Sequence, residues 1–168
     1  MKQVALLRGI NVGKSVRIGM ADLRELFTSL GCESVQTILQ SGNVVFEGAV
    51  TRAQLEDAIV ERFSYSSRVF VRSAAEFRAV AADNPFRGIA DDPSRMVITF
   101  LDDLPAGFSA PDVDPPERIA LTHRALYQWC PEGILTSQVP PAFWRTLGSR
   151  ATSRNLRTVD KLLALLDA

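Results

Sequence analysis

The sequence has only two cysteines and a single histidine: Cys32, Cys130 and His123. Two cysteines so far apart do not form the paired spacings of a disulfide framework, which favours a reducing compartment. No acidic residue or cysteine stands at metal-ligand spacing around His123, so no metal site is indicated. A catalytic Cys–His pair would require His123 to meet one of the two cysteines. We interpret His123 as an exposed turn residue and Cys32 as a small buried apolar residue.

The chain also lacks an excess of charge of either sign. It has 19 basic and 19 acidic residues, and its pI is about 6.6. This balance weakens the case for a bulk nucleic-acid binder, whose affinity rests on many Lys and Arg contacts to phosphate. No apolar run approaches the length of a membrane span, and Val4–Leu7 is too short for the core of a signal peptide. We therefore expect a cytoplasmic protein.

The first half of the chain alternates between strand and helix patterns. With 168 residues, 46% of them hydrophobic, the chain is long enough to bury a normal core. Strand patterns occupy residues 4–7, 35–39, 43–46 and 68–72, and helical patterns begin at Met20 and after the capping-box pair Thr51 and Gln54. This β-α-β-β-α-β order is typical of a ferredoxin-like fold.

The second half is also mixed. A capping box at Ser73 and Glu76 opens a helix, a strand is expected at 96–101, and a proline-rich irregular stretch at 102–116. A hairpin is expected at 118–121 and 125–129, a short helix at 141–147, and a last helix capped by Thr158. No internal repeat is clear. We predict an α+β fold in which a ferredoxin-like half, residues 1–80, packs against a smaller α+β half, residues 81–168, as a single compact unit.

The predicted topology brings two loops to the same end of the first sheet. The loop after the first strand and the turn between the second and third strands become neighbours. Their exposed backbone N–H groups and basic side chains could hold a small polar or anionic ligand. The predicted ligand-binding residues here are Arg8, Gly9, Asn11, Gly13, Lys14, Gln40, Ser41 and Asn43. The alternative is structural: the glycines supply positive φ, and the asparagines bond the local backbone.

Arg154 and Asn155 precede the last helix and complete the list of candidate residues. A helix N-terminus with an adjacent arginine can bind an anion. The alternative reading is a linker with a solvent-exposed Arg154, in which Thr158 alone caps the helix.

Two better-known functions are disfavoured by the sequence pattern. Residues 9–15, GINVGKS, have three residues where a phosphate-binding loop has four before its Gly-Lys pair, and the next helix begins only near Met20. The ferredoxin-like order is shared with RNA-recognition domains, but these stack bases on strand aromatics. The corresponding strands here offer only Phe46.

Other functions stay open. Nucleic acid could contact the late basic cluster of Arg145, Arg150, Arg154, Arg157 and Lys161. The protein could instead be an interaction module without a ligand. No general base, nucleophile or cofactor motif is identifiable, so we assign no catalytic residue and no cofactor, and leave open both enzymatic activity and oligomeric state.

Several short motifs resemble those of one bacterial family. These are RGINVGK at 8–14, MADL at 20–23, QSGNVVF at 40–46, Arg72-Ser73, NPF at 84–86, ALY at 125–127, and 152–155 with Thr158 and Lys161. In this order and spacing the chain resembles the "domain of unknown function 1697" family. The resemblance implies an α+β fold with ferredoxin-like elements and no established activity. The sequence departs from the pattern at Gly13-Lys14-Ser15, where a second glycine is usual, and at 130–137, which lacks an aromatic-Pro-Asp-Gly opening and an Arg-Ser-Lys stretch.

Overall fold

The computed structural model describes all 168 residues and contains two four-stranded antiparallel sheets with five α-helices. The chain divides into two compact units. The first consists of residues 1–78 and 161–168, and the second of residues 79–160. Each unit holds one sheet.

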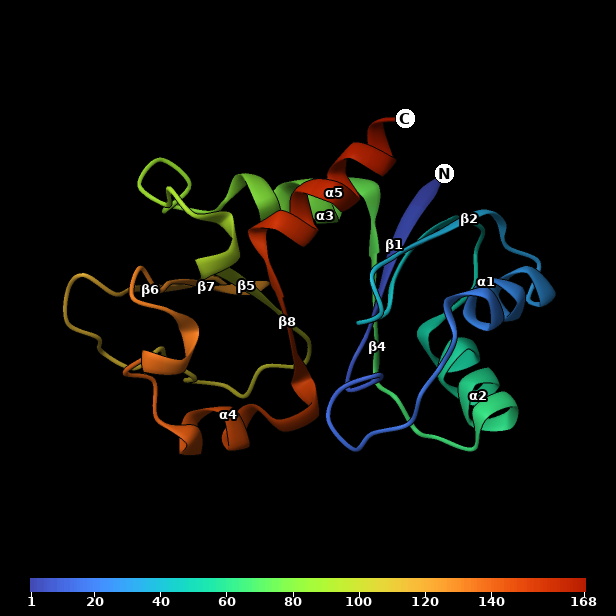
Figure 1. Cartoon of the computed structure of the whole chain (residues 1–168), viewed down its shortest axis with the longest axis horizontal. Helices are drawn as coiled ribbons and strands as arrows, with labels where there is room; N and C mark the ends of the chain where they lie inside the picture. The colour runs from blue at the N-terminus through green and yellow to red at the C-terminus, as the bar shows by residue number, and fades with distance from the viewer. The chain divides into compact units, whose positions relative to one another are not determined.

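The first unit contains the predicted β-α-β-β-α-β order. Its elements are β1 (Lys2–Leu7), α1 (Met20–Ser29), β2 (Glu33–Ile38), β3 (Asn43–Glu47), α2 (Arg52–Phe63) and β4 (Val69–Ser73) (Figure 1). The strand order β2-β3-β1-β4, with all neighbours antiparallel, is that of a ferredoxin-like sheet. The predicted fold of this half is confirmed.

One face of the first sheet is covered by α1 and α2, on the right in Figure 1. Phe27 of α1 packs edge-on against Phe46 of β3, with the ring centroids 5.1 Å apart. Each residue of the run Val4–Leu7 is 0% exposed, so both faces of β1 are covered, as its continuous apolar pattern predicted.

Local sequence signals set the ends of the helices. Thr51 and Gln54 form both bonds of a capping box at the start of α2. Ser73 and Glu76 make the same reciprocal pair before α3 (Ala74–Ala82). Both capping boxes are confirmed.

The second unit contains the other sheet. Its strands are β5 (Met96–Leu101), β6 (Arg118–Leu121), β7 (Ala125–Trp129) and β8 (Ala151–Asn155), with α4 (Pro141–Leu147) before β8 and short 3₁₀ turns at Pro93–Arg95, Ile134–Thr136 and Gly148–Arg150. The last helix, α5 (Leu156–Asp167), and α3 each include residues of both units. The hairpin and the short helix match the predicted ranges. No helix is both long and apolar enough to cross a membrane.

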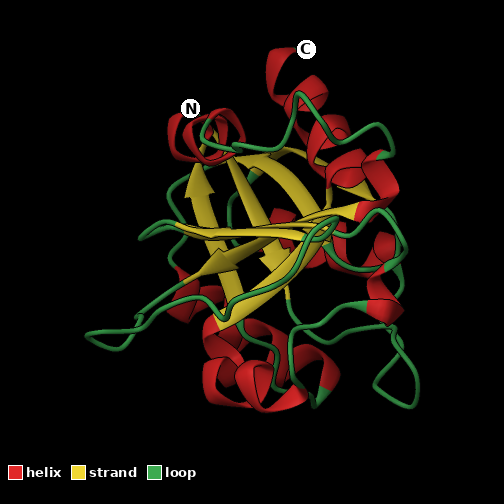
Figure 2. Ribbon diagram, turned by 90° about the vertical axis from the view of Figure 1, so that its left-hand side faces the viewer, coloured by secondary structure: helices red, strands yellow, loops and turns green.

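The second sheet repeats the topology of the first. Its order, β6-β7-β5-β8, is again fully antiparallel, with β5 in the place of β1. The strands of both sheets are drawn in yellow in Figure 2. One helix is missing from the repeat: residues 102–117, which connect β5 to β6, contain no helix where the first unit has α1. The proline-rich composition of this stretch explains the difference, because proline removes backbone donors and disrupts helices.

The structure corrects the prediction around residue 155. Residues 151–155 form β8, a strand that was not predicted, since ATSRN lacks an apolar alternation. The last helix begins at Leu156, and its cap is Asn155, whose Oδ1 accepts a hydrogen bond from Thr158 N at 3.0 Å. The predicted cap at Thr158 is therefore wrong, and Thr158 lies inside the first turn.

Candidate functional site

The two loops predicted to be neighbours do meet in the first unit. Leu7 N donates to Gly42 O at 2.9 Å, and Asn11 Nδ2 donates to Gln40 O at 2.7 Å. The loop after β1 and the β2–β3 turn therefore lie together at one end of the sheet, as the topology predicted.

Both asparagines of these loops make structural hydrogen bonds. Asn11 Oδ1 accepts from Ile18 N at 2.7 Å, and its Nδ2 also donates to Ile18 O at 2.9 Å. The Asn43 side chain is 0% exposed and donates to Ile38 O and to Ser41 Oγ. These contacts match the structural reading of the asparagines.

The backbone of the first loop is also held in place. Tyr65 Oη donates to Gly9 O, and Ser67 Oγ donates to Arg8 O, each at 2.8 Å. Gly9 and Gly13 both have positive φ. The side chains of Arg8, Lys14 and Gln40 are exposed. Ligand binding at these loops stays a prediction.

Arg154 and Asn155 lie in the second unit, on β8. The Arg154 side chain is buried, and its Nη1 donates to Thr152 Oγ1 and to Ser153 O, both at 2.9 Å. Burial lowers the pKa of this guanidinium to about 10. The alternative reading of a linker with a solvent-exposed Arg154 is wrong. The Asn155 side chain caps α5 by accepting a hydrogen bond from Thr158 N.

The remaining candidates behave as ordinary structural residues. His123 is exposed at the β6–β7 turn and accepts a hydrogen bond from Arg124 Nε at 3.0 Å. Cys32 lies in the core of the first unit, and Cys130 is a buried free thiol. Burial, followed by the charge of Glu117, raises the pKa of Cys130 to about 11. No three His, Cys, Asp or Glu side chains cluster as metal ligands would.

Of the late basic cluster, only Arg154 is buried. The other four members, Arg145, Arg150, Arg157 and Lys161, are exposed. Nucleic-acid binding through them stays a prediction.

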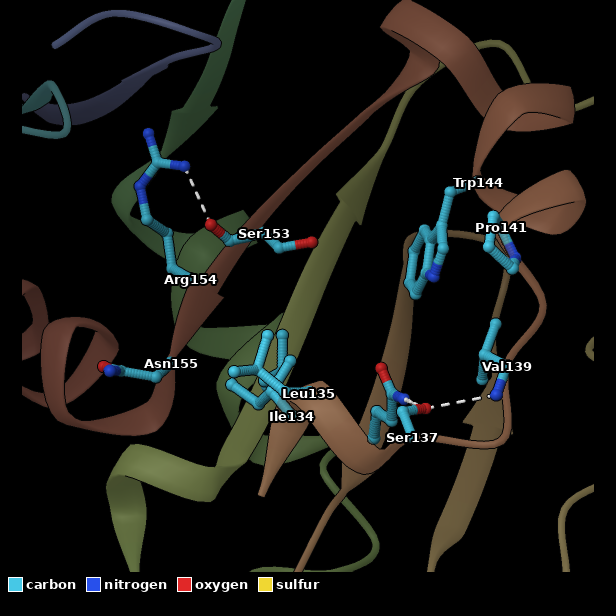
Figure 3. Close-up of a pocket in the computed structure, with 11 residues that line it drawn as sticks. Ile134, Leu135, Ser137, Val139, Pro141, Trp144, Ser153, Arg154 and Asn155 are labelled. Atoms are coloured by element: carbon cyan, nitrogen blue, oxygen red, sulfur yellow. Dashed lines mark hydrogen bonds between the residues drawn. The ribbon is translucent and has the colours of Figure 1, made fainter. Parts of the chain in front are cut away.

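A cavity of about 570 Å³ opens on the second sheet (Figure 3). Its walls are mainly apolar, and they come from β5, β7 and β8, from α4, and from residues 134–139. The lining residues are Val97, Gln128, Ile134, Leu135, Ser137, Val139, Pro141, Trp144, Ser153, Arg154 and Asn155. This volume is within the range of small-molecule sites, about 300–1,000 Å³.

The cavity lies on the sheet face that corresponds to the helix-covered face of the first unit. We aligned the two sheets on the last residues of their central strands, Leu7 and Leu101, which pair with the first residues of β4 and β8. At matched register positions the first unit has Ala5, Phe46 and Val71, where the second has Thr99, Gln128 and Ser153. Three apolar positions that pack against helices thus become polar where the helix is missing.

The same face of the second sheet is closed at its other end. Leu101, Leu126, Leu147 and Ala151 form an apolar cluster there, against which Phe108 and Phe143 pack, among others. Trp144 joins this cluster and also lines the cavity. One half of the face is therefore apolar and covered. The other half carries Thr99, Gln128 and Ser153, of which Gln128 and Ser153 line the cavity.

A hydrogen-bonded network surrounds Glu117, beside the cavity. Its carboxylate accepts from Ser137 Oγ at 2.6 Å, from Gln128 Nε2 at 3.0 Å and from Gln138 N at 2.8 Å. Burial opposes ionisation of Glu117, but these hydrogen bonds, with one from the Cys130 thiol, outweigh it and lower the carboxyl pKa. Glu117 is a buried carboxylate held by neutral donors.

The network around Glu117 supplies no activated nucleophile. A nucleophilic serine needs an adjacent base strong enough to take its proton. The lowered pKa of Glu117 makes it a weak base for Ser137. The raised pKa of Cys130 keeps its thiol protonated and unreactive.

Acid is expected to destabilise the protein partly through Glu117. Folding lowers the pKa of Glu117. Its contribution to the free energy of unfolding is therefore fully present above the pKa of the unfolded state, about 4.5, and is lost as the pH falls through the pKa of the folded state. Urea unfolding between about pH 6 and pH 3 should show a steeper loss of stability for the wild type than for Glu117→Gln. The exposed Glu132→Gln should keep the wild-type slope; equal slopes for all three proteins would contradict the assignment.

Sequence reasoning missed the cavity. One signal was present: Gln128 interrupts the otherwise apolar strand ALYQW, and a polar residue inside a buried strand requires a partner. Of its partners, Glu117 directly precedes the predicted β6–β7 hairpin, but no local pattern connects Ser137 to β7.

The chain is similar to a known protein family and to a solved structure. A family model described as "Protein of unknown function (DUF1697)" matches residues 1–127. No curated protein matches. The conserved bacterial protein SP0830 from Streptococcus pneumoniae has a similar structure, with a TM-score of 0.69, 21% sequence identity and coverage of 98% of both chains. At this identity the similarity shows a shared fold.

Proposed function

We propose that this chain, which belongs to the DUF1697 family of proteins of unknown function, binds a small molecule in the cavity of its second unit. The observation that carries the proposal is the replacement of three packed apolar positions by Thr99, Gln128 and Ser153, of which Gln128 and Ser153 line the open cavity. Ser153 is exposed and the Gln128 side chain donates only through Nε2, so this face keeps a hydroxyl and a carbonyl oxygen to which an occupant can bond.

The walls supply the apolar contacts that such an occupant needs. Trp144, Val139 and Leu135 line the cavity, and Leu135 is fully exposed. The Ser153 hydroxyl points toward the side where Trp144 lies (Figure 3). Ser153 Oγ is 2.7 Å from Thr99 Oγ1, and either hydroxyl can donate. A mainly apolar ligand with one or two polar groups fits this lining.

A fragment screen by ligand-observed NMR tests the proposal. Aromatic fragments are expected to bind with dissociation constants of about 0.1–1 mM, a range reasonable for small ligands. Ser153→Phe should place a ring in the cavity and weaken these fragments at least about tenfold. Ser149→Phe introduces the same ring at an exposed position outside the cavity and should leave binding unchanged. The absence of any fragment sensitive to Ser153→Phe would reject the proposal.

The loop pair of the first unit is a second candidate site for a small polar or anionic ligand. The observation that favours it is the direct bond from Asn11 to Gln40, which joins the two loops, with Lys14 exposed beside them. Isothermal titration of thermal-shift hits against Arg8→Ala and Lys14→Ala distinguishes the sites. A loop ligand loses affinity in these variants and is unaffected by Ser153→Phe.

A cytoplasmic location remains part of the proposal. Both cysteines are free thiols, as a reducing compartment allows. Cell fractionation with an antibody to the protein tests it, and recovery in an extracytoplasmic fraction would reject it.

A further inference from the structure

The Glu117 carboxylate fixes the direction of the Gln128 side-chain amide. An ionised carboxylate only accepts hydrogen bonds, so the Gln128 atom 3.0 Å from Glu117 Oε2 must be the amino group. The same amino group donates to Ser137 Oγ at 2.7 Å. Both amino protons are therefore used inside the protein, and the amide cannot reverse without placing its oxygen against the carboxylate.

Ser137 completes this arrangement. Its hydroxyl proton goes to Glu117, at 2.6 Å, so its oxygen accepts from Gln128 and from Val139 N at 3.2 Å. Ser137 has no proton left for a ligand. The hydroxyl is therefore a bridge that holds Gln128.

Gln128 Oε1 is the acceptor that remains. The Gln128 side chain makes its hydrogen bonds through Nε2, and it lines the cavity although the residue is only 3% exposed. The carbonyl oxygen is not used in either of these hydrogen bonds, so a ligand N–H or O–H in the cavity could donate to it. The cavity thus offers a fixed acceptor on its sheet face.

The charges around the cavity disfavour an anion. Arg154 is the charged residue of the lining, and its side chain points away from Trp144 and is bonded to Thr152 and Ser153 (Figure 3). The buried carboxylate nearby, that of Glu117, would repel a carboxylate or phosphate across a poorly screened interior.

We propose that the cavity selects neutral small molecules that have an aromatic or apolar body and an N–H or O–H group directed at Gln128 Oε1. Glu117 acts as the positioning residue that sets this selectivity. The inference rests on the proposed function and specifies the ligand class of the same cavity.

Three matched probes test the selectivity on the wild-type protein. Indole has the donor, 1-methylindole lacks it, and indole-2-carboxylate adds an anionic group. In ¹H–¹⁵N NMR titrations indole should bind about tenfold more tightly than 1-methylindole, as the loss of one buried hydrogen bond predicts. Indole-2-carboxylate should bind still more weakly. The resonances of Gln128 and Trp144 identify binding in the cavity.

Glu117→Gln separates positioning from simple structural support. A glutamine at 117 can donate as well as accept, so the Gln128 amide is free to reverse and present its amino group. The preference for indole over 1-methylindole should fall to within about twofold, and quinoline, which has only an acceptor, should gain affinity. Glu132→Gln removes an exposed charge and should keep the wild-type preference.

The outcomes distinguish the two proposals. Equal binding of indole and 1-methylindole in the wild-type cavity would overturn the inference and leave the proposed function intact. Tight binding of indole-2-carboxylate would also overturn it. No perturbation of Gln128 or Trp144 by any probe, together with a failed fragment screen, would overturn both. If Glu117→Gln does not fold, the wild-type comparison alone decides the inference.

Discussion

Replacing Phe46 with glutamine is expected to lower the free energy of unfolding by about 5 kcal/mol. Phe46 is fully buried and packs edge-on against Phe27, with the ring centroids 5.1 Å apart. Glutamine loses this packing and introduces an amide among apolar neighbours. The matched position in the second sheet is Gln128, where Glu117 and Ser137 satisfy the same amide. A buried glutamine is therefore tolerated in the strand only where hydrogen-bond partners for its amide are present.

Equilibrium urea unfolding followed by circular dichroism measures the effect. The loss is comparable with the whole stability of many small domains, about 5–15 kcal/mol, so an unfolded variant counts as agreement. Phe46→Leu keeps an apolar side chain and should cost about 1.5 kcal/mol. If Phe46→Gln is no less stable than Phe46→Leu, the helix-covered face is not packed as described.

Gly42→Ala is expected to destabilise the protein by about 3 kcal/mol. Gly42 has a φ of +87°, and a Cβ there would lie 2.8 Å from Ile10 Cδ1 and 2.9 Å from Leu7 Cβ. Both neighbours are buried, so neither side chain can move away easily. Backbone strain and overpacking therefore act together, at the point where the two loops of the first unit meet.

Gly13→Ala is the matched control for Gly42→Ala. Gly13 also has a positive φ, of +50°, but a Cβ there would meet no atom within 4 Å. Gly13→Ala should lower the free energy of unfolding by about 1 kcal/mol, from backbone strain alone. The same urea experiment compares the two variants, and equal losses would show that the close approach of the loops contributes nothing.

The two candidate sites offer different chemical groups to a ligand. The prediction relied on Arg8, Lys14 and Arg154 as a source of positive charge. Arg154 is buried and bonded within β8, and its side chain points away from the cavity that it lines. A ligand of the second unit therefore meets hydroxyl and amide groups, while a loop ligand of the first unit would meet exposed basic side chains.

The sequence by itself determined the elements of the first unit and the meeting of its two loops. Capping boxes, turn glycines and apolar periodicity act over a few residues, so they are readable along the chain. Strand order followed from those elements, because the β-α-β-β-α-β arrangement leaves few alternatives. The ends of β5, β6, β7 and α4 were readable for the same reason, but β8 was not, because ATSRN carries no local strand signal.

Only the tertiary structure decided the cavity and its polar network. The predicted hairpin of β6 and β7 brings Glu117 near Gln128, but Ser137 joins them only through the course of residues 134–139, which no local pattern encodes. The proline-rich stretch between β5 and β6 could be read from the sequence, but the polar sheet face where the helix is missing could not. It appears only when the two sheets are aligned, because the register places Gln128 and Ser153 where the first unit buries Phe46 and Val71.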